Sequence, residues 1–332
     1  MTASNSAGWK RSPYISRSVL FIAAIYFIPT LLPSLFGWLL GVLAVPIAYV
    51  LTVEGYEQGI ITLRNSLLIA GAGALLTGRL DLFLFTLTLV PLGYSLYSCG
   101  RANRNEAVTG GYGVLILGIS WFIFWTIYGM FTGIQPYQHL VNLLDAGFVQ
   151  TYELYRTNAD LPAEMQAKLA SVIAELRELI PRILPGILCC SVLVTVWMNQ
   201  VVLNSLLRRR HPETTTRPPY SYWKLPEQLV WIPIAATVLF LLSDNRLKDL
   251  GLNVLLISGV VYFFQGLAVF IHLLGRWKVP PYLRILLYVM LVIQSYGLVL
   301  ITLLGIGETW MNIRPEKENE PPEQGPQSER DM

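Results

Sequence analysis

The sequence predicts an all-helical integral membrane protein, a polytopic bundle of about nine transmembrane helices with one amphipathic helix outside the membrane. Three observations predict this class. Of the 332 residues, 54% are hydrophobic and only 14% are charged, against roughly 25% charged residues in soluble domains. The apolar residues gather in long stretches, and a bilayer core takes roughly 20 helical residues to cross. Several stretches are apolar on every face, which excludes the alternating strands of a barrel.

The first apolar run, from Val19 to Val53, is too long for one span. Pro29, Pro33 and Gly37 lie near its middle, where proline removes a backbone donor, so we expect two helices there. No small-residue cleavage pattern interrupts the run, which indicates a retained helix rather than a removed signal. The count falls to eight if one stretch is re-entrant. The nine predicted spans are 19–32, 35–53, 60–78, 80–99, 112–133, 183–207, 229–243, 250–274 and 283–306.

Lysine and arginine in the short loops predict the orientation. With residues 1–18 in the cytoplasm, most basic residues, including the run Arg208 to Arg210, fall on the cytoplasmic side. The opposite short loops hold only Arg79, Arg246 and Lys248. The N-terminus is therefore expected in the cytoplasm and, with nine spans, the C-terminus on the opposite side. A re-entrant stretch would reverse the side of the C-terminus.

Residues 135–182 separate a five-span region, 19–134, from a four-span region, 183–314, and have the apolar pattern of an amphipathic helix. We expect Asp160 to cap this helix and Pro181 to end it. It is expected on the bilayer surface or over the outer mouth of the bundle, as a stiff connector or as a gate, which amphipathicity does not distinguish. The apolar positions are Leu161, Met165, Leu169, Val172, Leu176, Leu179 and Ile180.

The motifs of the common enzyme classes are missing from the sequence. There is no phosphate-binding loop, no H-E-x-x-H helix and no G-x-S-x-G elbow. The three histidines are far apart, and the three cysteines, two of them adjacent, are expected to be apolar fillers. We therefore expect no catalytic residue, no metal, no cofactor and no enzymatic activity. Nucleic-acid binding is not expected without a basic face, and the polar tail 315–332 is expected to be disordered.

Polar side chains inside apolar spans are costly, and they therefore mark candidate functional positions. Gln200 and Asn204 share a face of the sixth span, and Tyr262, Gln265 and His272 form a stripe on the eighth. Uncharged groups suit a neutral or zwitterionic ligand better than a proton relay. The alternative is that they make interhelical hydrogen bonds, each worth about 1 kcal/mol or less. The candidate substrate-binding residues are Asn199, Gln200, Asn204, Tyr262, Gln265, His272 and Gln294.

Five segments, all from the C-terminal half, have a recognisable pattern. They read VVLNSLLRRRH at 201–211, PYSYWKLPEQ at 219–228, VVYFFQGLAVFIHLL at 260–274, VPPYLRILLYV at 279–289 and LLGIGETWMNIR at 303–314. In these segments the chain resembles the YybS-like family of predicted bacterial membrane proteins, which has no established activity. The resemblance implies a multi-pass protein of the bacterial inner membrane, distantly similar to the substrate-binding S-components of energy-coupling-factor vitamin transporters.

This resemblance also implies partners. S-components meet their coupling subunit through an A-x-x-x-A face on the first helix, whereas this chain has the motif at Ala44 to Ala48 and at Ala70 to Ala74. Besides the lipid bilayer, the implied partner is a coupling subunit with its ATPases. The function this implies is binding or uptake of a small polar molecule. The alternative is a non-transporting membrane scaffold or regulatory partner, and the sequence sets no oligomeric state.

Overall fold

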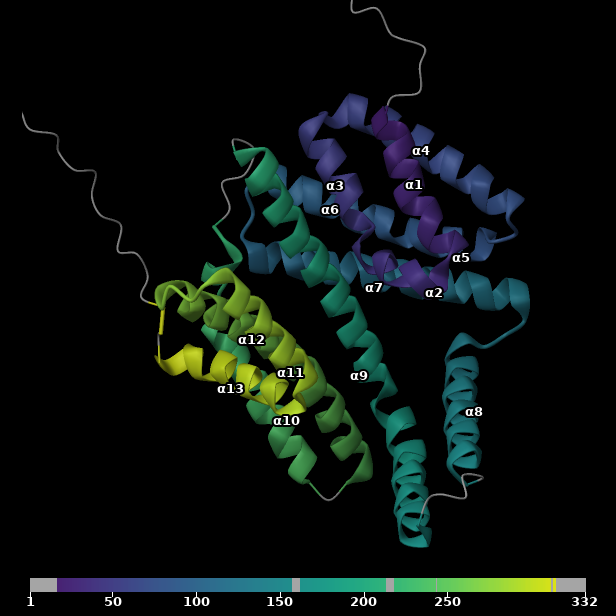
Figure 1. Ribbon diagram of the computed structural model, residues 1–332, viewed down its shortest axis with the longest axis vertical. Coiled ribbons are helices and arrows are strands. Elements are labelled where there is room, and N and C mark those ends of the chain that lie inside the picture. The colour runs from purple at the N-terminus through teal and green to yellow at the C-terminus, as the bar shows by residue number, and fades with distance from the viewer. Residues whose placement is uncertain (1–16, 157–161, 213–217, 243, 312, 315–332) are drawn as a thin grey trace, which may run out of the picture. The chain divides into compact units, whose positions relative to one another are not determined.

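The computed structural model describes residues 17–156, 162–212, 218–242, 244–311 and 313–314. Within these ranges every regular element is a helix, which confirms the all-helical class (Figure 1). Among the described helices, five are long and apolar enough to cross a membrane, and the count rises to seven if each of two bent helix pairs is one span. This is fewer than the nine spans expected, because the other apolar helices, Ala44–Val53 and Glu227–Leu241, are short.

The chain folds as two compact units, residues 1–217 and residues 218–332, called here unit 1 and unit 2. The division falls between Arg217 and Pro218, after the run of arginines that ends the longest helix. The described helices of unit 1 are α1 (Arg17–Leu31), α2 (Pro33–Phe36), η1 (Gly37–Val42), α3 (Ala44–Val53), α4 (Tyr56–Leu76), α5 (Leu80–Thr86), η2 (Leu87–Leu89), α6 (Val90–Arg101), α7 (Glu106–Thr132), α8 (Pro136–Arg156) and α9 (Ala163–Arg210).

The first apolar run is broken more sharply than the sequence suggested. The α1 helix and the following α2–η1 stretch make an angle of 108°. Proline at the start of α2 and glycine at 37 and 41 weaken the α-helix here, and residues 37–42 form a 3₁₀ helix. The single helix expected over 35–53 is therefore wrong, because regular α-helix begins only at Ala44. The Tyr26 hydroxyl of α1 donates to the Leu43 carbonyl and fixes the end of the break.

The short helix α3 is in the core of unit 1, where it packs against α4, α6 and α9. A side chain at Gly93 of α6 would place its Cβ 2.6 Å from the Cβ of Ile47, so glycine is what lets these two helices touch. Both A-x-x-x-A motifs are inside this core, with Ala44, Ala48, Ala70 and Ala74 each at most 1% exposed. Neither motif presents a free face to a partner.

The longest helix, α9, continues where the sequence predicted two separate elements. It runs for 48 residues without interruption and contains both Pro181 and Pro185, so Pro181 does not end the amphipathic helix as expected. At about 1.5 Å per residue the rod is about 70 Å long, more than twice the thickness of a bilayer core. Part of α9 therefore projects beyond any membrane that the rest of it crosses. The predicted cap, Asp160, lies outside the described residues.

A tertiary contact explains how α9 tolerates its prolines. Pro185 has no N–H to pair with the carbonyl of Pro181, four residues earlier. The Tyr137 hydroxyl of α8 donates to that carbonyl over 3.3 Å. The sequence pattern could not show this compensation, because Tyr137 is 44 residues away from its partner.

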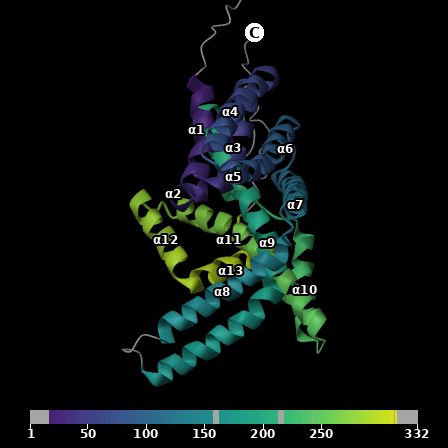
Figure 2. The same ribbon diagram turned by 90° about the vertical axis from the view of Figure 1, so that its right-hand side faces the viewer.

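The α8 helix lies beside the N-terminal half of α9 and forms a helical hairpin with it (Figures 1 and 2). Arg177 donates through Nε and Nη2 to the two carboxylate oxygens of Asp145 over 2.6 and 3.0 Å. Ile173 is buried between the helices, whereas Met165, Val172 and Leu179 are 54%, 43% and 41% exposed. The hairpin therefore keeps an apolar stripe on its outer face.

Unit 2 is built around the crossing of two helices. Its described elements are η4 (Tyr220–Tyr222), η5 (Glu227–Val230), α10 (Trp231–Leu241), α11 (Asn245–Arg276), α12 (Pro281–Ile293) and α13 (Ser295–Met311). A Cβ at Gly266 of α11 would lie 1.8 Å from the Ile301 carbonyl oxygen of α13, and one at Gly305 would lie 2.0 Å from the Tyr262 carbonyl oxygen. Two glycines thus bring the backbones of α11 and α13 into contact.

The last predicted span, 283–306, is wrong as a single helix. The backbone leaves the helical conformation at Gln294, and the helices on either side of this break make an angle of 104°. Such a bent pair is a broken span or a re-entrant segment. No proline marks the break, which is why the apolar run alone did not reveal it.

Candidate functional site

Asn199 holds together the broken backbone at the start of unit 1. Its Nδ2 donates to the carbonyls of Gly41 and Thr195 over 2.6 and 2.7 Å, and its Oδ1 accepts from the Val45 N–H over 3.1 Å. The side chain is 0% exposed. The 3₁₀ stretch leaves backbone groups without regular helical partners, and this amide supplies partners for two of them. The contact agrees with the structural interpretation of Asn199.

Replacing Asn199 by leucine is expected to lower the free energy of unfolding of unit 1 by about 2–3 kcal/mol, because the Gly41 carbonyl and the Val45 N–H would be buried unpaired. Thermal unfolding of the purified protein in detergent measures this. Asn142→Leu is the matched control, since the Asn142 side chain is exposed on α8 and accepts from Gln138 within the same helix. Equal melting temperatures for the two variants would contradict the role of Asn199.

Gln200 and Asn204 meet at one residue that the sequence analysis missed. Gln200 Nε2 donates to the backbone carbonyl of Glu106 over 3.0 Å, and Asn204 Nδ2 donates to its Oε1 over 3.2 Å. Glu106 opens α7, whose cap is Asn105, with a side chain that accepts from the Ala107 N–H. An asparagine followed by a glutamate is a helix-start signal, so the sequence did contain a clue. The predicted start at residue 112 was too late.

In unit 2, Gln265 joins three parts of the fold. It is 1% exposed. Its Oε1 accepts from the Leu225 N–H over 3.0 Å, and its Nε2 donates to the Gly305 carbonyl over 2.8 Å. Three residues earlier on the same helix, Tyr262 is 2% exposed with the Thr309 side chain beside its hydroxyl. These two predicted residues therefore lie together at the crossing of α11 and α13.

The other two predicted residues of unit 2 lie apart from this pair. His272 is half-buried further along α11, with its ring 5.6 Å from that of Tyr222 in an edge-on contact. Gln294 lies in the bend between α12 and α13, and its side chain is exposed. It precedes Gly305 by eleven residues, about 16 Å along a helix. The expected stripe of Tyr262, Gln265 and His272 is thus only partly a single cluster.

The most strongly buried charges of unit 2 were not among the predicted site residues. The side chains of Glu308 and Arg314 are 0% and 5% exposed, and Arg314 Nε donates to Glu308 Oε1 over 2.9 Å. Glu308 Oε2 also accepts from the Ile313 N–H over 3.0 Å. A lone carboxylate near the end of an apolar run was the only sequence signal, because the pair forms through a turn that local patterns do not reveal.

A segment that we call the strap, residues 219–230, closes over these groups. Arg314 Nη1 donates to the carbonyls of Ser221 and Trp223 over 2.9 and 3.0 Å. The Tyr220 hydroxyl donates to the Phe264 carbonyl, and the Leu225 N–H donates to Gln265. Two side chains, Gln265 and Arg314, hold the strap through its backbone, and the backbone carbonyl of Phe264 holds it through Tyr220. The polar groups of unit 2 form one connected, buried network.

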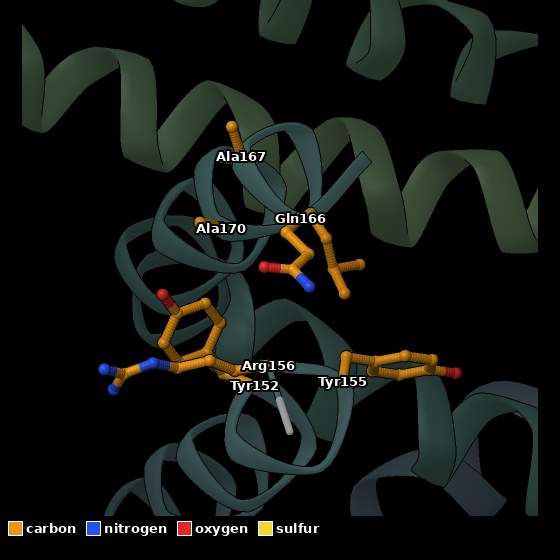
Figure 3. Close-up of a pocket in the computed structure, with 7 residues that line it drawn as sticks. Tyr152, Tyr155, Arg156, Gln166, Ala167 and Ala170 are labelled. Carbon is orange, nitrogen blue, oxygen red and sulfur yellow. The ribbon is translucent and has the colours of Figure 1, made fainter. Parts of the chain in front are cut away.

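The described residues around this network include no metal centre. Across the described ranges, no group of three or more His, Cys, Asp or Glu side chains could hold a metal ion. A pocket of about 210 Å³ lies elsewhere, between the end of α8 and the start of α9. Tyr152 and Arg156 lie together on one side of it, Gln166 faces them, and Tyr155 points away (Figure 3). Arg156 already has an ion-pair partner in Glu153 at 3.6 Å.

Comparison with protein families identifies the group to which the sequence belongs. The model of the predicted membrane protein family DUF2232 matches residues 18–307. The chain belongs to the DUF2232 family. The match covers the helices of both units up to Gly307 in α13, including Asn199 and Gln265 but not the Glu308–Arg314 pair. No curated protein and no solved structure matches this DUF2232 protein significantly.

Proposed function

We propose that this DUF2232 protein binds a small polar molecule, neutral or zwitterionic, within the membrane and takes part in its uptake as a substrate-binding component. The observation that carries the proposal is the buried network of unit 2. An ion pair with side chains at most 5% exposed costs free energy to desolvate, and pairs of this kind are often no more stable than apolar residues of the same size. In membrane proteins such groups mark functional sites by default.

Discontinuous helices support the same function. Secondary transporters place their substrates where helices are interrupted, because the interruption frees backbone groups for binding. Here one bent pair, with an angle of 108°, opens unit 1, and another, with an angle of 104°, closes unit 2. The likeness to S-components of energy-coupling-factor transporters, carried by the YybS-like segments, agrees with a binding role. Neither feature calls for catalysis, and we propose no enzymatic activity.

The proposed location is the bacterial inner membrane with a cytoplasmic N-terminus. In this orientation the arginines at the end of α9 face the cytoplasm, as the positive-inside rule favours. The α8–α9 hairpin then projects on the outer side. A coupling subunit would need a contact other than the A-x-x-x-A motifs, because both are buried in unit 1.

Ligand-dependent thermal stabilisation of the purified protein tests the proposal. We expect a compound from a panel of small polar metabolites to raise the melting temperature of the natural protein. In Gln265→Leu, which breaks the buried network of unit 2, the shift is expected to disappear, whereas the control Asn142→Leu is expected to keep it. A panel that stabilises none of these proteins would contradict a binding role. Purification in mild detergent then tests uptake, since the proposal expects an ATPase pair to co-purify.

A second candidate is a non-transporting scaffold or regulatory partner. The observation that favours it is the exposed apolar stripe of Met165, Val172 and Leu179 on the projecting hairpin. A scaffold would bind another protein through such a surface and would not respond to metabolites. The same thermal-shift panel therefore separates the two candidates.

A further inference from the structure

Two buried hydrogen-bond donors in unit 2 have no acceptor. They are the hydroxyl of Tyr262 and the Nη2 of Arg314. The two residues are 2% and 6% exposed. Buried polar groups in native proteins are nearly always paired, and an unpaired one calls for an explanation, such as a water or a ligand that binds to it.

Both donors belong to the same neighbourhood at the end of α13. Trp223 packs against the apolar cluster that includes Tyr262, and its carbonyl accepts from Arg314 Nη1. The Nε of the same guanidinium donates to Glu308. The unpartnered Nη2 belongs to the same guanidinium group. The end of α13 thus gathers a phenol, a guanidinium and a carboxylate in one buried cluster.

The chemistry of the unpartnered donors suits a carboxylate. A guanidinium N–H and a phenol O–H each donate, and a carboxylate accepts on both oxygens. The Glu308 carboxylate has lone pairs beyond the two bonds it accepts, and these suit an ammonium group. A small zwitterion carries both charges, whereas a neutral sugar or a cation would offer no charged acceptor to the Nη2 of Arg314.

In the structure, carbonyl oxygens of the strap occupy positions on Arg314 that the carboxylate oxygens of such a ligand would take. The carbonyl oxygens of Ser221 and Trp223 accept from Nη1 of Arg314, which is how the oxygens of a bound carboxylate would accept from it. The strap is otherwise held to α11 by Tyr220 and Gln265. Only the two hydrogen bonds from Arg314 Nη1 to the Ser221 and Trp223 carbonyls must break for the strap to leave the guanidinium.

We propose that Arg314 and Tyr262 bind the carboxylate of a small zwitterionic solute and that the strap, residues 219–230, occupies this site until the solute displaces it. The inference rests on the proposed function and deepens it by naming the class of ligand. Glu308 then pairs with the ammonium group of the solute. Binding and strap release are one equilibrium, so loosening the strap raises the apparent affinity.

Tyr262→Phe tests the recognition half of the proposal. The probes are glycine, acetate and methylammonium, each added to the purified full chain in detergent while thermal unfolding is followed. Glycine and acetate are expected to raise the melting temperature, and methylammonium is not. Tyr262→Phe removes a hydroxyl that donates to no acceptor in the fold and contacts Thr309, so the protein alone should lose about 1 kcal/mol or less, yet its affinity for glycine should fall about tenfold. Tyr296→Phe, on an 83% exposed ring of α13, is the control.

Tyr220→Phe tests the strap half. It removes the bond to the Phe264 carbonyl and is expected to raise the affinity for glycine about threefold. If neither acetate nor glycine shifts the melting temperature, or if Tyr262→Phe binds glycine as the natural protein does, the proposal is overturned. A metabolite that stabilises the protein independently of Tyr262 would overturn this inference and leave the proposed function standing. Glycine binding that depends on Tyr262 without any uptake would do the reverse.

Discussion

Replacing Gly266 by alanine is expected to destabilise unit 2 by about 3 kcal/mol or more, because overpacking against backbone cannot be relieved by a side-chain rotation. The added Cβ would lie 1.8 Å from the Ile301 carbonyl oxygen and 2.9 Å from the Gly305 N. The helices α11 and α13 would have to separate, and the bond from Gln265 to the Gly305 carbonyl would be lost with them. Thermal unfolding in detergent, with protease resistance of unit 2 as a second readout, measures the effect.

The same helix provides the matched control. A Cβ at Gly259 meets nothing within 4 Å, so Gly259→Ala is expected to be neutral or to stabilise α11 by about 0.5–1 kcal/mol through its helix propensity. If both variants unfold at the same temperature, the backbone contact between α11 and α13 is not as the structure has it.

Removing the charge of Glu308 is the second large effect. In Glu308→Leu the Arg314 guanidinium would stay buried without a counter-charge, and the expected loss is about 3–5 kcal/mol of the free energy of unfolding. The double variant Glu308→Leu with Arg314→Leu is expected to recover most of this loss, because replacing both members of a buried pair by apolar residues is often close to neutral. A double-mutant cycle on the purified protein measures the coupling between the two residues.

The stability recovered in the double variant distinguishes a coupled ion pair from two residues that stabilise unit 2 independently. If the double variant is as unstable as the sum of the single variants, Glu308 and Arg314 stabilise unit 2 independently and the pair has no coupling. Glu178→Gln is the control, because the Glu178 carboxylate is 71% exposed and its pair with Arg182 is at the surface. Exposed pairs of this kind contribute about 1 kcal/mol or less.

The sequence predicted the helices well where a single physical cause decides them. Long apolar runs must be helical in a bilayer, so α4, α7 and α11 were expected close to their observed positions. The predictions failed where tertiary contacts decide. Pro181 looked like a helix end, but α9 continues through it to Arg210, and the Pro181 carbonyl that Pro185 leaves without a helical donor accepts from Tyr137 of another helix. The run 283–306 looked like one span, but it bends at Gln294 without a local signal.

In the candidate site, too, the sequence indicated which residues are unusual but not which residues they contact. Asn199, Gln200 and Gln265 could be singled out because an amide inside an apolar span is unusual, and all three are buried with hydrogen-bond partners in their own unit. Their partners could not be predicted, because Asn199 meets Gly41 across 158 residues of sequence and Gln265 meets Leu225 across 40. Whether these amides also contact a ligand stays a prediction.

The chain is expected to cross the membrane along α9, with the α8–α9 hairpin on one side and the three arginines on the other. Side-specific labelling of single cysteines measures this, in a background whose three cysteines are replaced by alanine. A cysteine at Ala174, exposed on the hairpin, should react with a membrane-impermeant maleimide in intact cells, and a cysteine at Arg209 should react only after the membrane is opened. Labelling of both positions from the same side would contradict the account.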